Sequence, residues 1–324
     1  MKKIFSFFFF VSCLMMLRAQ ESRLLRFPTI YGDNVCFTYA GNLYTCNANG
    51  GTARRLTDHE GVEIFSKYSP DGSKIAYTAQ YDGNSEVYVM PAEGGIPQRV
   101  TFTATLNRDD VSDRMGPNNI CMGWKDKETI IYRSRWRDFN DWKGQLYTAN
   151  INGSMPEQLP FPHGGFCSYS PDKKKIAFNR VFREFRTWKR YRGGQADEIW
   201  IYDFASKQTT KITDNDAQDI IPMWAGNKVY YVSDRDKRMN IFVYDFTTKQ
   251  TKKLTEFKEF DVKFPSLGDK AIVFENGGYI YKLNLSNDKV EKISIQINED
   301  FSMGRNKIVS VKENIFSWDL SSDG

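Results

Sequence analysis

The stretch from Arg180 to Arg192 interleaves cationic and aromatic side chains, a composition that suits several kinds of anion. It holds six Lys or Arg residues against one acid, with an aromatic residue at every third position. Cations between stacking rings suit single-stranded nucleic acid. Arginines also pair with protein carboxylates or with the carboxylate of a peptide. Our candidates for docking or peptide contact are the residues that close the stretch: Trp188, Lys189, Arg190, Tyr191 and Arg192.

The overall charge argues against nucleic acid as the partner of this stretch. The formal net charge is +5, and removing residues 1–19, which we interpret as a signal peptide, takes away three cations and no acid and leaves +2. A nearly balanced protein is not a general polyanion binder. The basic residues are also confined to one loop. We therefore favour packing or docking of the loop against a neighbouring part of the protein, another domain or a subunit, and keep peptide contact as the second interpretation.

The two histidines are the residues that could serve as a general base. A Ser hydrolase needs a base to take the hydroxyl proton and a third group to orient that base. His59 and His163 occupy corresponding loops, in LTDHEG and LPFPHGG, and the equivalence favours a structural role in both. The sequence has no G-x-S-x-G elbow to expose a nucleophile. We assign no catalytic residue and expect no peptidase activity from this chain alone.

Cofactor and metal motifs are missing from the sequence. It has neither a GxxxxGK[ST] nor a GxGxxG loop, and no CxxC. The acidic piece NRDDVSD (107–113) lacks the ligand spacing of a calcium loop. We interpret Asp234 and Asp236 as turn formers that pair with the adjacent Arg235 and Arg238. The sequence predicts no cofactor and no bound metal.

A sixteen-residue unit, repeated six times, must position all of these residues. Each copy is an alternating apolar strand, a turn rich in Gly, Asn or Ser, and a second strand ending in an apolar residue and usually Thr. The alternation predicts strands with one face in a core and the other lightly packed. The copies are NLYTCNANGGTARRLT (42–57), EVYVMPAEGGIPQRVT (86–101), QLYTANINGSMPEQLP (145–160), EIWIYDFASKQTTKIT (198–213), NIFVYDFTTKQTKKLT (240–255) and YIYKLNLSNDKVEKIS (279–294).

A second motif precedes these copies and completes a four-stranded unit. It is clearest in YSPDGSKIAYTA (68–79) and YSPDKKKIAFNR (169–180), where Pro, Asp and Gly suit successive positions of a tight turn. The units recur every 39 to 59 residues. Four short strands at this spacing are typical of β-propeller blades. The sequence predicts an all-β fold, a six-bladed β-propeller of four-stranded antiparallel blades. Insertions lengthen the loops at 103–119 and before residue 198.

The ends of the chain suggest further segments. Residues 1–19 have a basic start, an apolar core and Ala19, the pattern of a signal peptide, so we expect export to the periplasm or beyond. Retention as an uncleaved anchor and lipidation at Cys13 are weaker alternatives. No stretch is long enough for a stable membrane span. We place the propeller at 23–297 and interpret 298–324 as the start of a second, truncated propeller, so the chain resembles a fragment.

The cysteines of the mature chain are too few for a disulfide scaffold. Four remain in about 300 residues, at positions 36, 46, 121 and 167. Cys36 and Cys46 flank the apparent hairpin CFTYAGNLYTC. They could face each other in a disulfide, and two free buried thiols are at least as consistent with the pattern.

Three segments together resemble the amino-terminal propeller of tricorn-type serine peptidases. They are residues 56–95, the loop TWKRYRGG with its strand (187–204), and PMWAGNKVYYVSDRD (222–236). The SPDG turn alone is shared with TolB-like propellers and with prolyl-oligopeptidase relatives, whereas the TWKRYRGG loop is more discriminating. The resemblance covers the chain from about Leu24 to its end.

The resemblance implies that the chain is the non-catalytic propeller of an exported peptidase. In that family a second propeller, a PDZ-like domain and a catalytic core follow, and the catalytic Ser and His would lie beyond Gly324. The propeller would scaffold the assembly and border the passage of peptide substrates or products. Its partners would be the remaining domains and peptides, with a homo-oligomer open and no nucleic acid. The alternative is a free-standing TolB-like periplasmic module that binds a protein without chemistry.

Overall fold

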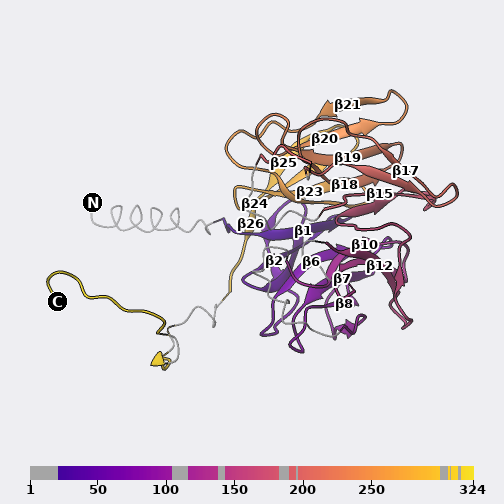
Figure 1. Cartoon of the computed structure of the whole chain (residues 1–324). Helices are drawn as coiled ribbons and strands as arrows, with labels where there is room; N and C mark the ends of the chain where they lie inside the picture. The colour runs from indigo at the N-terminus through magenta and orange to yellow at the C-terminus, as the bar shows by residue number, and fades with distance from the viewer. Residues whose placement is uncertain are drawn as a thin grey trace, which may run out of the picture.

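A computed structural model of the chain shows a ring of six four-stranded antiparallel sheets, which confirms the predicted six-bladed β-propeller (Figure 1). It describes residues 21–103, 116–137, 143–181, 190–194, 196–299, 306, 308–312 and 315–324. The predicted signal peptide lies outside the described residues, as do most of the 103–119 insertion and residues 182–189 of the basic stretch. In the part of the chain that the structure describes, no helix is long and apolar enough to cross a membrane.

Each blade is built from consecutive strands, and in every sheet the strand order follows the chain. Blades one and two consist of β1 (Arg26–Tyr31), β2 (Asn34–Tyr39), β3 (Asn42–Asn47) and β5 (Arg54–Arg55), then β6 (Glu63–Tyr68), β7 (Lys74–Ala79), β8 (Glu86–Pro91) and β9 (Gln98–Arg99). Blades three and four consist of β10 (Ile120–Trp124), β11 (Thr129–Ser134), β12 (Gln145–Asn150) and β13 (Glu157–Gln158), then β14 (Cys167–Tyr169), β15 (Lys175–Phe178), β16 (Trp200–Asp203) and β17 (Gln208–Lys211). Blades five and six consist of β18 (Asp219–Ala225), β19 (Lys228–Ser233), β20 (Asn240–Asp245) and β21 (Gln250–Lys253), then β22 (Lys263–Leu267), β23 (Ala271–Asn276), β24 (Tyr279–Asn284) and β25 (Val290–Ile293).

The SPDG motif forms the turn between the first two strands of blade two. Gly72 has a φ of 72°, and its N–H donates to the Ser69 carbonyl over 2.9 Å. The Asp71 carboxylate accepts from the Ser69 hydroxyl at 2.6 Å and from the Ser73 N–H at 3.1 Å, so the side chain closes the turn. Lys173, with a φ of 61°, occupies the corresponding left-handed position in blade four. The predicted turn chemistry is confirmed in blade two.

The expectation of one lightly packed face, made for the strand that opens each repeated unit, was wrong for β8 and β20. The first five residues of β8 and the first four residues of β20 are all buried. Both faces of a blade's middle strands are covered because each blade packs against a neighbour on either side. Alternation along a strand distinguishes these two faces but does not show that one of them is exposed.

The threonine that ends most of the repeated units holds the third strand of its own blade. In four blades its hydroxyl accepts the backbone N–H of the residue fourteen positions earlier, at 2.8 to 3.0 Å. The four threonines are all buried. The bond satisfies a strand N–H that would otherwise lie in the interior without an acceptor. The threonines are Thr57, Thr101, Thr213 and Thr255.

The two ends of the ring are joined by backbone pairing and by one buried carboxylate. β26 (Ile295–Gln296) pairs in parallel with β4 (Gly51–Thr52) of blade one. The Glu275 carboxylate on β23 accepts the Phe27 N–H at 2.6 Å and the Arg26 Nε–H at 2.8 Å. Burial raises the pKa of Glu275, while Arg26 opposes that rise.

Apolar side chains fill the axis of the ring. In five of the six blades, the pairing of the first strand with the second strand shifts register. Such a shift marks a β-bulge, which can turn a side chain inward. Phe27, Phe65 and Phe264 lie in three of these bulges with positive φ, an unusual conformation for such residues. The Phe27 ring centroid lies 4.5 Å from that of Phe65 and 4.6 Å from that of Phe264. The ring centroid of Phe166 in blade four lies 6.3 Å from that of Phe65, so aromatic rings from opposite sides of the ring of blades meet at the axis.

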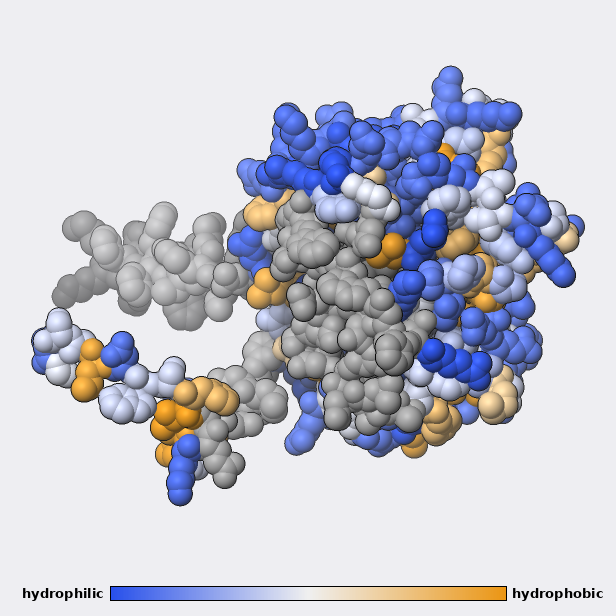
Figure 2. Space-filling view, in the orientation of Figure 1, coloured by the Kyte–Doolittle hydropathy of each residue, from blue (hydrophilic) through white to orange (hydrophobic). Residues whose placement is uncertain are grey.

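The described residues after the propeller carry exposed apolar side chains. Phe316 and Trp318 are among them, with 92% and 81% of their surfaces exposed. In Figure 1 the end of the chain lies away from the ring, and in Figure 2 much of the coloured part of the propeller surface is hydrophilic. The expectation that 298–324 begins a second propeller stays a prediction.

The cysteines that could have formed a disulfide are free thiols. Cys36 lies opposite Thr45, and Cys46 lies opposite Val35. The two cysteines are therefore one position out of register with each other, and both are free thiols. Both thiols are buried, and burial raises the pKa of each to about 12. The disulfide alternative is therefore wrong.

We predict that Glu275→Ala will weaken ring closure. Removing a buried carboxylate that binds a backbone N–H and an arginine costs about 3–5 kcal/mol. Urea unfolding measures the change in the free energy of unfolding. Glu291→Ala is the matched control, because Glu291 pairs with Lys289 at the surface and its loss should change little. Equal effects of the two substitutions would contradict the role that we assign to Glu275.

Candidate functional site

The basic loop contacts the next blade of the same ring. Trp188 and Lys189 lie outside the described residues. The Arg192 guanidinium donates to the Asp234 carboxylate at 2.9 Å and to the Asp234 carbonyl at 3.2 Å. Arg190 donates from Nε to the Lys237 carbonyl at 3.1 Å. Asp234 and Lys237 belong to the connection between β19 and β20, so the loop of blade four is tied to blade five.

The glycine after Arg192 lies against the side chain of Tyr191. A Cβ at Gly193 would lie 2.4 Å from the Tyr191 hydroxyl oxygen, so a larger residue at 193 would displace the tip of that side chain. The sequence marked the TWKRYRGG loop as distinctive, and in the structure Tyr191 packs on its first glycine. Docking to another domain and contact with a peptide stay predictions for Tyr191, Arg190 and Arg192.

The predicted pairing of Asp234 and Asp236 with adjacent arginines was wrong. Asp234 pairs with Arg192 and accepts the Gln218 N–H at 2.9 Å, while Asp236 lies 2.8 Å from the Lys253 ammonium. Arg235 donates to Asp219 at 3.0 Å. Neighbours in a tight turn point apart, and groups from other strands come closer than sequence neighbours do.

The two histidines lie in connections between blades, as expected. The His59 ring centroid lies 4.2 Å from that of Tyr81. His163 has a φ of 73°, and its backbone N–H donates to the Gln145 side chain at 3.1 Å. The His59 contact packs its side chain, and the His163 contact holds its backbone in place. Both contacts are structural.

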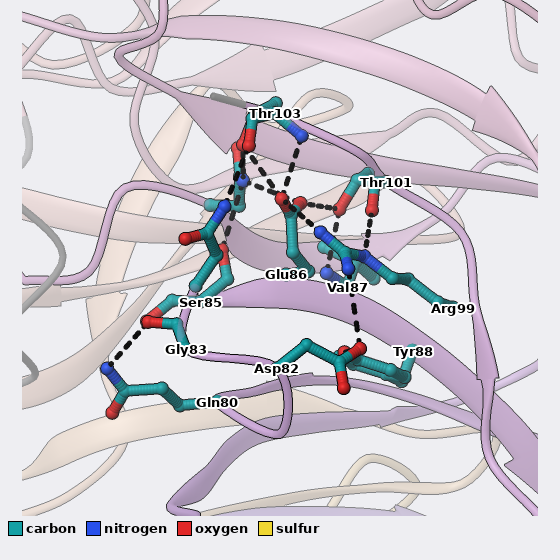
Figure 3. Close-up of polar contacts among 12 residues, drawn as sticks. Gln80, Asp82, Gly83, Ser85, Glu86, Val87, Tyr88, Arg99, Thr101 and Thr103 are labelled. Carbon is teal, nitrogen blue, oxygen red and sulfur yellow. Dashed lines mark hydrogen bonds and ion pairs between the residues drawn. The ribbon is translucent and has the colours of Figure 1, made fainter. Parts of the chain in front are cut away.

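A buried carboxylate clamps both described stems of the 103–119 insertion (Figure 3). Glu86, at the start of β8, accepts the Thr103 N–H at 2.7 Å on one stem and the Asn119 amide at 2.9 Å on the other. It also accepts from Arg99 at 3.0 Å and Thr101 at 2.5 Å. Such a fully satisfied carboxylate is better explained as an anchor than as a reactive group.

A second buried carboxylate, Glu63, lies at the start of β6 between blades one and two. It accepts the Leu43 N–H at 3.0 Å, the Tyr81 hydroxyl at 2.9 Å and the Thr57 hydroxyl. Burial raises the pKa of Glu63 to about 7, although the bonds from Thr57 and Tyr81 oppose that rise. Glu63 therefore titrates near neutral pH in the folded protein.

The first strands of all six blades surround a pocket of about 320 Å³. It opens where first and second strands turn, because the SPDG turn contributes Ser69 and Pro70 to its lining. Phe166, Met122 and Ile221 line its inner part, beside the aromatic ring on the axis. The connections between second and third strands, which carry the basic loop's contacts, emerge at the opposite end of each blade. The pocket and the basic loop therefore belong to different faces.

The pocket holds an ammonium group that the sequence did not single out. Lys67, near the end of β6, donates from Nζ to the Ser266 hydroxyl of blade six at 2.8 Å. Burial lowers the pKa of Lys67 to about 8, a shift that the nearby Cys121 and Cys167 oppose. Lys173 and Asp269, which also line the pocket, are exposed at its mouth. No motif predicted this site, because each lining strand contributes only a few residues and ring closure brings them together.

Within the described ranges, no group of three or more His, Cys, Asp or Glu residues is placed to hold a metal ion. The described sites bring together hydrogen-bonding and charged groups. The pocket joins one ammonium to aromatic walls, and the basic loop joins two guanidinium groups to the next blade.

Comparison with known proteins identifies relatives over nearly the whole ring. Residues 22–289 match the family model described as the tricorn protease N-terminal beta propeller domain. The chain is 27% identical over 292 residues to a tricorn protease homolog of Saccharolobus solfataricus, covering 89% of this chain and 26% of that protein. It thus spans about a quarter of that relative's length.

Two solved structures share the fold. A crystal structure of the tricorn protease superposes with a TM-score of 0.74 at 24% identity, covering 86% of this chain and 27% of the other. TolB from Acinetobacter baumannii superposes with a TM-score of 0.58 at 18% identity, covering 75% of this chain and 57% of the other. Identities this low show the likeness of fold alone.

We predict that Glu63 makes stability depend on pH. Its folded pKa of about 7 lies above the ordinary 4.5, so the folded state holds a proton that the unfolded state releases between these values. The resulting stability is fully present below pH 4.5 and is lost as the pH rises through 7, a change of about 3 kcal/mol. Urea unfolding of the parent chain and Glu63→Gln from pH 4.5 to 8 measures it.

The difference in the free energy of unfolding between the parent chain and Glu63→Gln isolates the effect of Glu63, because the other groups titrate alike in both proteins. The parent chain should lose stability relative to Glu63→Gln as the pH rises. Glu60→Gln, at an exposed neighbouring position, should track the parent chain. Parallel curves for the parent and Glu63→Gln would show that Glu63 does not titrate in this range.

We predict that Arg192→Ala destabilises the propeller by about 1 kcal/mol, because it removes the guanidinium partner of the nearly buried Asp234 carboxylate. Among the described residues, the exposed Arg190 bonds one carbonyl and no carboxylate, so Arg190→Ala should stay within about 0.5 kcal/mol of the parent. Unfolding in guanidinium chloride measures the free energy of unfolding of both variants. An equal or larger effect of Arg190→Ala would refute the importance of the pair with blade five.

Proposed function

Because the chain belongs to the tricorn protease N-terminal β-propeller family, we propose that it is the non-catalytic scaffold of an exported tricorn-type serine peptidase. It positions the remaining domains and borders the passage of peptide substrates or products. Proteolysis is the activity of the parent assembly, carried out by parts other than this propeller.

The main support is the extent of the family match. Residues 22–289 cover all six blades apart from β25, the last strand of blade six, and the tricorn protease homolog that the chain matches is about four times as long as the matched part. The remainder of that relative has no counterpart in the propeller. A scaffold role is consistent with the contacts of the ring, whose buried polar groups accept hydrogen bonds from neighbouring strands and connections.

The axis guides our proposal for the peptide route. Phe27, Phe65 and Phe264 contact one another at the axis, and their packing blocks an extended chain from passing along its full length. We therefore place the peptide route across the face on which the pocket opens. The basic loop, on the opposite face, is the candidate for docking another domain or subunit.

The export part of the proposal rests on residues 1–19. Their basic start, apolar core and terminal Ala19 are the features of a cleaved secretory signal. Cell fractionation of the source organism locates the protein, and recovery of the chain in the cytoplasmic fraction would contradict this part alone.

Affinity purification from the source organism tests the assignment. A tag placed within an exposed turn of the propeller should recover peptidase activity, either on a longer continuous chain or on a separate catalytic subunit. The recombinant 324-residue chain, assayed with an unstructured fluorogenic peptide, should show no turnover. Its catalytic partner must be supplied for the peptide to be cleaved.

Two results would overturn the proposal. One is a tagged protein that is recovered without any peptidase, which would favour a free-standing binding module. The other is turnover by the recombinant chain that His59→Ala or His163→Ala abolishes, because the propeller itself would then be catalytic. Asn152→Ala, in an exposed turn, serves as the control for handling of the variants.

A further inference from the structure

The ammonium group in the axial pocket has no carboxylate bonded to it. Among the described contacts of Lys67 Nζ, the one hydrogen bond is to the Ser266 hydroxyl at 2.8 Å. An ammonium has three N–H donors, so one neutral acceptor leaves most of its capacity unused. Asp269 is the acid in the pocket lining, and its carboxylate is exposed at the mouth, where it accepts the Gly32 N–H at 2.9 Å.

The walls around Lys67 combine aromatic and apolar side chains with serine and threonine hydroxyls. Trp124 and Trp224 line the pocket, and each indole N–H already donates to a carbonyl, of Lys67 at 2.9 Å and of Gly226 at 3.2 Å. The Trp224 ring also stacks on Phe246, with the centroids 5.2 Å apart, so only the part of this ring that lines the pocket is open to an occupant. A volume of about 320 Å³ lies at the lower end of the range for small-ligand sites.

We propose that the axial pocket binds the C-terminal end of a short peptide, with the carboxylate paired to Lys67 and the last apolar side chain against the tryptophans. The choice of a peptide among monocarboxylates rests on the proposed function. The choice of a carboxylate rests on the pocket alone.

The charge of the lining favours a carboxylate over a phosphate. Phosphate sites in proteins gather guanidinium groups or several converging N–H donors. The lining of this pocket contains no arginine, and its second cation, Lys173, lies at the mouth. One buried ammonium matches the single charge of a carboxylate.

The closed inner end favours a chain terminus over an internal segment. Phe166 lines the pocket and packs against Phe65 and Phe264, which closes the axis behind it. A chain that enters must stop there. An internal segment carries no backbone charge to pair with Lys67, whereas the last residue of a peptide brings its carboxylate with it.

Titration calorimetry with the complete chain tests the site. The tripeptide Ala-Ala-Phe should bind at least ten-fold more tightly as the free acid than as the C-terminal amide. Lys67→Met should abolish the preference, because the methionine keeps most of the side-chain volume and removes the charge. Lys249→Met, at an exposed turn of blade five, should retain it.

The comparison of acid with amide on the unsubstituted chain needs no variant, so it stands even where Lys67→Met fails to fold. Equal binding of acid and amide, no binding of either, or a preference that survives in Lys67→Met would overturn the site. Tighter binding of inorganic phosphate than of the acid would also overturn it.

A second probe separates this inference from the proposed function. The compound 3-phenylpropanoate has an apolar ring and one carboxylate but no peptide bond. If 3-phenylpropanoate binds at Lys67 and the tripeptide does not, the pocket is a carboxylate site, and its assignment to peptides is overturned. The recovery of peptidase activity with the tagged chain tests the proposed function in a separate experiment. A failure to recover peptidase activity would therefore not change the comparison of the acid with the amide.

Discussion

Closure of the ring is the constraint on which the rest of the structure depends. Six blades can surround an axis only if the last meets the first, and here Glu275 of blade six binds the backbone N–H of Phe27 and the side chain of Arg26 in blade one. Pairing of β26 with β4 extends the same junction. In the described part of the chain, each four-stranded blade is made from consecutive strands and takes none from another blade, so these contacts at the junction of the first and last blades close the ring.

Closure also creates the central pocket and limits it. The bulges in the first strands direct Phe27, Phe65 and Phe264 toward one another, where their contact removes apolar surface from water and blocks the axis. The space on one side of these rings is a pocket with a closed inner end rather than a channel. Lys67 lies in it because its strand reaches the axis beside blade one, close enough to bond Ser266 of blade six. A site made in this way has no sequence motif.

The opposite face is organised by buried polar groups. Glu86 joins the described stems of the long insertion, Glu63 joins blade one to blade two, and Asp234 receives the basic loop from the neighbouring blade. Each carboxylate accepts several donors, which offsets the cost of burying its charge. This arrangement explains why the distinctive TWKRYRGG segment need not contact any other molecule to have a role: Arg192 already has a partner inside the ring.

The sequence by itself determined the all-β fold, the number of blades and the turn at Ser69–Gly72, because these follow from local periodicity and from the backbone preferences of Pro, Asp and Gly. It also pointed to Arg190 and Arg192 by their composition. Only the tertiary structure decided that Cys36 and Cys46 remain free, that Asp234 pairs with Arg192, and that Lys67 lies in a pocket. The physical reason is the distance along the chain: these relations depend on strand register and on contacts between blades, which form only when segments far apart in the sequence are brought together.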